Sequence, residues 1–222
     1  PPQMVMNMRI GNMVGFCVGE PWNARAINDR IGFTATTSQA IWPEHPEKIL
    51  GTRSEWVERN PNTARALVAA LMDAARWIDA SEENKRETAR ILAKRAWLNT
   101  KEQYLTGRML GEYDNGLGRR WQDAHPIRFY DQGEVSFPWL SDGMWFLTQF
   151  RRWGLLKTAP DYQAVAGRIN RIDVWKEAAQ AVGGISAPAA LMRSSTLIDG
   201  TVWTGADPEG YARGFAIQRK GA

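Results

Sequence analysis

The chain changes direction within the stretch Val14-Gly15-Phe16-Cys17-Val18-Gly19-Glu20-Pro21-Trp22-Asn23. Apolar side chains alternate with small ones up to Val18, which predicts a buried strand, and Gly19-Glu20 then predicts a sharp turn. Pro21 is favoured at the first position of a helix, so the chain is expected to continue as a helix from Trp22. The N-terminus of a helix presents unpaired amides and a positive partial charge. This turn is therefore predicted to form part of a pocket for a small anion.

Length and composition set broad limits on the class of protein. The chain has 222 residues, of which 44% are hydrophobic and 23% charged, as expected for one large globular domain or two small ones. Eleven tryptophans indicate large apolar contacts between packed elements. The net charge of +4 comes from scattered Lys and Arg pairs, which favours solvated faces over a nucleic-acid footprint. No apolar run is long enough to predict a transmembrane helix.

The order of predicted elements indicates an α/β fold that is rich in helix. Short strands are expected near the two ends of the chain, at residues 15–18, 31–36, 48–52, 201–203 and 214–218. Helices are expected between or beside them, at residues 3–11, 22–27, 54–60, 60–80, 81–96, 101–110, 139–153 and 168–182, with a short one after Asp207-Pro208. Residues 111–138 are expected to be irregular, and residues 37–46 to form a polar loop or a short helix.

Two charged residues are candidates for the anion pocket. Lys48 opens a predicted strand and would supply a full positive charge, although a solvated surface lysine is the more common case. Glu20 lies where the anion would bind. Its carboxylate either holds Lys48 or another donor in place, or interacts with the start of the helix, and spacing alone leaves both open.

The single cysteine and the two histidines give no strong catalytic or metal pattern. Cys17 in Gly15-Phe16-Cys17-Val18-Gly19 imitates a nucleophile elbow, but a buried structural cysteine is the favoured interpretation. A cysteine-dependent hydrolase is therefore the least favoured function. His45 and His125 each precede a proline, and their wide spacing from Cys17 excludes a zinc motif, so no metal site and no cofactor are predicted.

Several motifs together resemble the nitrate-binding proteins of ABC importers. They are the stretch 15–23, the run 41–48, Glu55-Trp56-Val57 with Asn60-Pro61, Trp77-Ile78-Asp79, Val135-Ser136-Phe137-Pro138, Trp145-Phe146-Leu147, Arg152-Trp153-Gly154 and Asn170-Arg171. The resemblance implies a periplasmic-binding-protein-like, two-lobed fold of type II. It also implies that Gly19, Glu20 and Lys48 contribute to the anion site. Similar proteins that bind bicarbonate tend to carry an acid at the Lys48 position, so Lys48 favours nitrate or nitrite.

The same resemblance implies how the chain is divided between lobes and where in the cell the protein works. Residues 1–50 would belong to the α/β lobe that bears the anion turn, and residues 51–222 to the helix-rich remainder, which crosses back between the lobes. The chain is expected to be a C-terminal fragment whose first part would precede Pro1. It would be a non-enzymatic component that works with the importer's membrane subunits, in the periplasm or anchored to the membrane through the missing N-terminal part. A cytoplasmic nitrate sensor that regulates a partner protein is the alternative.

Overall fold

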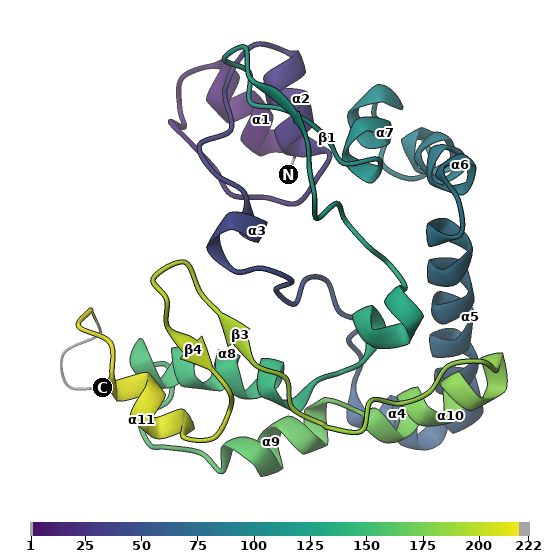
Figure 1. Cartoon of the computed structure of the whole chain (residues 1–222), viewed down its shortest axis with the longest axis vertical. Helices are drawn as coiled ribbons and strands as arrows, with labels where there is room; N and C mark the ends of the chain where they lie inside the picture. Colours follow the sequence, from purple (N-terminus) through teal and green to yellow (C-terminus); the bar gives the residue numbers. More distant parts are fainter. Residues whose placement is uncertain (1, 218–222) are drawn as a thin grey trace. The chain divides into compact units, whose positions relative to one another are not determined.

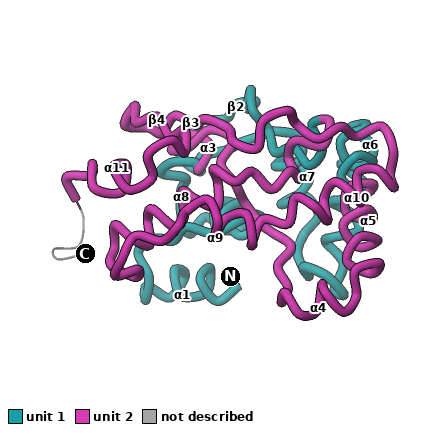
Figure 2. Tube along the Cα trace, turned by 90° about the horizontal axis from the view of Figure 1, so that it is seen from below, with its two compact units in different colours: residues 1–37, 75–131 teal, residues 38–74, 132–222 magenta. Residues whose placement is uncertain are grey.

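The computed structural model describes residues 2–217, which divide into two compact units. Unit 1 comprises residues 1–37 and 75–131, and unit 2 comprises residues 38–74 and 132–222 (Figure 2). The chain therefore passes between the units three times. The division into lobes at residue 50 remains a prediction.

Unit 1 is built from helices and one hairpin (Figure 1). Its helices are α1 (Pro2–Arg9), α2 (Trp22–Asn28), the end of α5 (Pro61–Asp79), α6 (Glu82–Ala93) and α7 (Gln103–Met109). Strands β1 (Glu112–Asp114) and β2 (Arg120–Gln122) pair antiparallel, with Tyr113 opposite Trp121. Helix α7 contacts α2, α6 and β1, so it connects the other elements of this unit.

Unit 2 holds the remaining elements of residues 38–217. They are α3 (Ser38–Ile41), α4 (Ser54–Arg59), most of α5, the 3-10 segment η1 (Asp131–Ser136), α8 (Leu140–Arg152), α9 (Tyr162–Ile169), α10 (Ile172–Val182), β3 (Ser195–Thr196), β4 (Val202–Trp203) and α11 (Pro208–Arg213). Helix α8 contacts both α9 and α11, and β3 pairs antiparallel with β4.

The predicted helices are largely confirmed, and most of the predicted strands are wrong. Helices form in each predicted helical segment, and α3 is the short helix foreseen as one option. Of the predicted strands, only residues 201–203 contain one, β4. Residues 15–18, 31–36 and 48–52 have no strand, nor do residues 214–217, while Gln218 lies outside the described residues. The elements missed are α9 and β3 and, within the stretch expected to be irregular, the β1–β2 hairpin and η1.

The failed strand at residues 15–18 has a simple physical reason. A strand needs a neighbour to pair its backbone groups, and among residues 2–217 this segment has no sheet partner. Val14 is fully exposed, so the alternation of apolar and small residues does not mark a buried face there. The segment that leads into α2 is therefore an extended loop.

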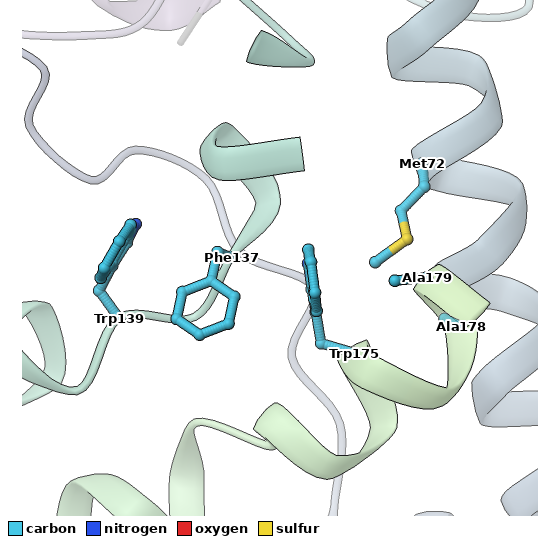
Figure 3. Close-up of a cluster of buried hydrophobic side chains, with 6 residues drawn as sticks. All are labelled: Met72, Phe137, Trp139, Trp175, Ala178 and Ala179. Carbon is cyan, nitrogen blue, oxygen red and sulfur yellow. The ribbon is translucent and has the colours of Figure 1, made fainter. Parts of the chain in front are cut away.

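The core of unit 2 contains a group of aromatic rings around Trp175. Phe137 stands between the rings of Trp139 and Trp175, at centroid distances of 4.8 and 5.0 Å with edge-on geometry (Figure 3). Met72 of α5 and Ala178 and Ala179 of α10 complete the cluster. The Trp175 indole N–H donates to the Ser136 hydroxyl at 3.0 Å, so this large side chain is buried with its polar atom paired.

A second buried cluster in unit 2 connects the β3–β4 pair to α8. Trp203 of β4 is 1% exposed, and its indole N–H donates to the Ser141 carbonyl at 2.9 Å.

In unit 1, the Asp79 carboxylate at the end of α5 accepts hydrogen bonds from the backbone amides of Phe129 and Tyr130 at 2.6 and 2.8 Å. Each unit thus has buried contacts of its own that hold its loops on its helices.

Replacing Trp175 by alanine should strongly destabilise the protein. Truncation of a buried aromatic side chain costs about 3–5 kcal/mol through lost burial and the cavity left behind. The matched control is Trp97→Ala, because Trp97 is 65% exposed and its removal should change stability by less than about 0.5 kcal/mol. Urea unfolding followed by circular dichroism measures both. Equal losses for the two variants would contradict the assignment of the core.

Candidate functional site

The turn at residues 18–24 is fixed by side chains on both sides of Pro21. Helix α2 begins at Trp22, with Pro21 as its N-cap rather than its first residue. One oxygen of Glu20, Oε2, accepts the amide of Ala24 at 3.0 Å, and the Asn23 amide group donates to the Val18 carbonyl at 2.5 Å. Glu20 is therefore the acid that interacts with the helix start, one of the two roles considered from the sequence.

Arg108 of α7 supplies the second contact of Glu20. The Arg108 Nε lies 2.9 Å from Glu20 Oε1, and the arginine side chain is only 8% exposed. Its Nη1 donates to the Glu112 carbonyl at 3.3 Å, and its guanidinium carbon lies 4.1 Å from the centroid of the Tyr113 ring. Arg108 thus joins the turn before α2 to the β1–β2 hairpin.

The surroundings of Glu20 alter its acidity. Partial burial raises the pKa of the Glu20 carboxyl, while the Arg108 charge and the Ala24 amide oppose that rise. Burial also raises the pKa of the nearby Tyr113 hydroxyl. The negative charge of Glu20 is thus already matched within unit 1 by a guanidinium and a helix amide.

The turn retains donors for a further acceptor. Within residues 2–217, the backbone amides of Gly19, Trp22 and Asn23 have no hydrogen-bond partner. Amides at the first turn of a helix are the ordinary donors to a small anion. These unpaired amides are suited to binding a small anion through hydrogen bonds.

Lys48 lies in an extended loop of unit 2 with its side chain 80% exposed. Its ammonium is 3.1 Å from Glu47 Oε2, and its backbone amide donates to the same oxygen at 3.0 Å. The structure therefore brings Gly19 and Glu20 together in unit 1 and places Lys48 in unit 2. Their convergence on one anion stays a prediction.

Two further residues lie near these positions in the sequence. Cys17 is exposed in a loop, so its prediction as a buried cysteine on a strand is wrong. Trp42, next to the Lys48 loop, is buried at 7% exposure, and its ring centroid lies 4.5 Å from that of Trp145. Among the described residues, no group of three or more His, Cys, Asp or Glu side chains is placed to hold a metal ion.

Sequence reasoning missed Arg108 and Tyr113. Both lie far along the chain from Glu20, in a segment with no motif of its own. One signal was available: an acid next to a helix start favours a cationic partner once it is partly shielded from water, although the sequence does not say which arginine supplies it.

Comparison with known proteins identifies the relatives of the chain. The chain is 39% identical to the nitrate/nitrite binding protein NrtA of Nostoc over 99% of its own length and 50% of the length of that protein. The crystal structure of the periplasmic nitrate-binding protein NrtA from Synechocystis matches with a TM-score of 0.90 at 36% identity. The match covers 98% of this chain and 57% of the other. The chain is homologous to the NrtA proteins.

The same comparisons add a family model and a second type of relative. Residues 1–93 match the model of the NMT1-like family. The bicarbonate-binding protein CmpA of Synechococcus elongatus is 33% identical over 98% of this chain and 50% of its own length. The predicted periplasmic-binding-protein-like, helix-rich fold is confirmed, and the chain spans about half the length of the curated relatives that it matches. No helix among the described residues is long and apolar enough to cross a bilayer.

Removing Arg108 should destabilise unit 1 in a pH-dependent way. In Arg108→Ala, Glu20 keeps its burial but loses its cation, which costs roughly 2–3 kcal/mol near neutral pH. Because burial already raises the pKa of Glu20 and Arg108 opposes that rise, the variant raises this pKa further. The loss should therefore shrink as the pH falls through the raised pKa, since the folded variant then takes up a proton more readily than the unfolded chain.

The control for this experiment is Arg120→Ala on the hairpin. The Arg120 side chain is 83% exposed, so its removal should cost less than about 1 kcal/mol. Denaturant unfolding at several pH values measures both variants. A destabilisation by Arg108→Ala that does not change with pH would contradict the role given to the pair.

Proposed function

We propose that this chain binds nitrate, or the related anion nitrite, as part of the solute-binding component of an ABC-type importer. The observation that carries the proposal is the similarity to NrtA proteins over almost the whole chain, at the level of both sequence and fold. NrtA and CmpA are named as binding proteins for nitrate/nitrite and for bicarbonate, so the proposed role is to capture and deliver the anion without changing it chemically.

Two kinds of donor are proposed for the anion, and each is described within its own unit. In unit 1, the amides of Gly19, Trp22 and Asn23 supply neutral hydrogen bonds and the partial charge of the helix start. In unit 2, Lys48 supplies a full positive charge on a flexible side chain that is 80% exposed. On this proposal, the anion exchanges its water shell for these donors when it binds.

Glu20 acts in this proposal as a positioning residue. A free carboxylate beside the anion would repel it, but Glu20 is paired with Arg108 and with the Ala24 amide. These contacts hold the turn in the shape that leaves the neighbouring amides available. The Arg108 charge also cancels the Glu20 charge, so the pair does not repel an anion at the neighbouring amides.

Nitrate is preferred over bicarbonate because of Lys48. The ammonium of Lys48 carries a permanent positive charge, which suits an anion that stays charged at all physiological pH values and needs no metal counter-ion. CmpA, at 33% identity, is named for bicarbonate, so bicarbonate is the proper competitor in any test. The importer's membrane subunits are the proposed partners. The periplasm is the proposed location, by analogy with the periplasmic NrtA of Synechocystis.

Isothermal titration with nitrate, nitrite and bicarbonate tests the proposal on the protein expressed from its complete gene. Nitrate or nitrite should bind in a saturable way and more tightly than bicarbonate. Lys48→Ala should weaken that binding by about tenfold or more, because a hydrogen bond to a charged group is worth roughly 1.5–3 kcal/mol.

Lys157→Ala is the matched control, since Lys157 is also exposed and lies in unit 2. It should bind nitrate like the unaltered protein. Two results would overturn the proposal: tighter binding of bicarbonate than of nitrate, or equal nitrate affinities for the two lysine variants.

A further inference from the structure

A polar pocket lies in unit 1, formed by residues that do not belong to the turn before α2. It has a volume of about 410 Å³ and is lined by side chains that include Arg9 of α1, Arg25 and Asp29 at the end of α2, and Thr100, Lys101 and Tyr104 around the start of α7. Volumes of this order are usual for small-molecule sites, and they greatly exceed the space that a single nitrate fills.

Asp29 fixes the cationic wall of this pocket. Its carboxylate pairs with the Arg9 guanidinium, lies 3.7 Å from the Arg25 Nε, and accepts the Tyr104 hydroxyl at 3.2 Å. Two guanidinium groups thus share one carboxylate that is only 19% exposed. This leaves one positive charge unbalanced on this wall and holds both arginines in defined positions.

The rest of the lining adds a third cation and an unused hydroxyl. Within residues 2–217, Lys101 forms no ion pair, and its ammonium lies 5.6 Å from the centroid of the Tyr104 ring. The buried Thr100 hydroxyl has no hydrogen-bond partner among the described residues, although a buried hydroxyl ordinarily has one. The pocket therefore combines Arg9, Arg25 and Lys101 against Asp29 alone with a free hydroxyl donor.

We propose that this pocket binds a small oxyanion, of the phosphate or the polycarboxylate type, that carries two or more negative charges. Planar guanidinium groups match the paired oxygens of phosphate and carboxylate groups, and the excess of two positive charges favours a multiply charged ligand over nitrate. The Thr100 hydroxyl supplies a donor to one of its oxygens. Phosphate esters and polycarboxylates share this chemistry, and the site is independent of the proposed nitrate site.

Titration calorimetry with inorganic pyrophosphate and with citrate, at constant ionic strength set by chloride, tests the proposal. At least one probe should bind with one-site saturation, and the tighter one identifies a phosphate-type or a carboxylate-type site. Lys101→Ala should weaken this binding by about tenfold, and Thr100→Val should weaken it by a smaller factor.

The matched control is Arg95→Ala, which removes an exposed cation of unit 1 that does not line the pocket. It should leave probe binding unchanged, and Lys101→Ala should keep the melting temperature and the nitrate affinity of the unaltered protein. The proposal is overturned if neither probe saturates, or if Arg95→Ala and Lys101→Ala weaken binding equally, because either result indicates general charge attraction only.

Discussion

The contact between Glu20 and Arg108 determines the local geometry on which the proposed nitrate site depends. Burying a carboxylate is costly unless it is paired, and Glu20 is paired twice, by the Arg108 guanidinium and by the Ala24 amide. These bonds connect the loop of residues 14–20 to α2, to α7 and, through Tyr113, to the hairpin. A loop without sheet partners thereby gains a defined shape, and the amides at the start of α2 gain a fixed direction.

Each unit is stabilised by its own buried contacts, and these hold the loops that carry the candidate residues. In unit 2, Trp42 packs against Trp145 a few residues before Lys48, so the start of the Lys48 loop is anchored in the core of that unit. In unit 1, the buried residues Leu105 and Met109 of α7 flank Arg108 on the helix. The apolar packing and the polar site are thus built from the same elements.

The sequence predicted the helices well because their signals are local. Helix α5 shows the 3.6-residue period of apolar residues, and α6 begins after Ser81, whose hydroxyl accepts the Asn84 amide. The strand at residues 15–18 failed because alternation predicts a strand only where a neighbouring strand exists. Helix α9 was missed although Asp161 caps it, since it ends at Ile169 only shortly before α10 begins at Ile172.

The candidate site was predictable only in part. Glu20 contacts the helix start and also pairs with a donor other than Lys48, so both roles considered for it are seen, but the donor Arg108 is remote in the sequence and no pattern points to it. Lys48 could be named as a candidate from the sequence. Its ion pair with Glu47 was not predicted, although the two residues are adjacent in the chain. Contacts between distant segments depend on the folded chain, so these were the parts that required a structure.

The central idea is that the amides at the start of α2 receive the anion. The most direct measurement is to follow the backbone amide resonances of the nitrogen-labelled protein during a titration with nitrate. The account predicts saturable shifts that are largest at Gly19, Trp22 and Asn23, with the Glu20–Arg108 pair intact. Saturable nitrate binding that leaves these three amides unmoved, with the largest shifts elsewhere in the chain, would contradict it.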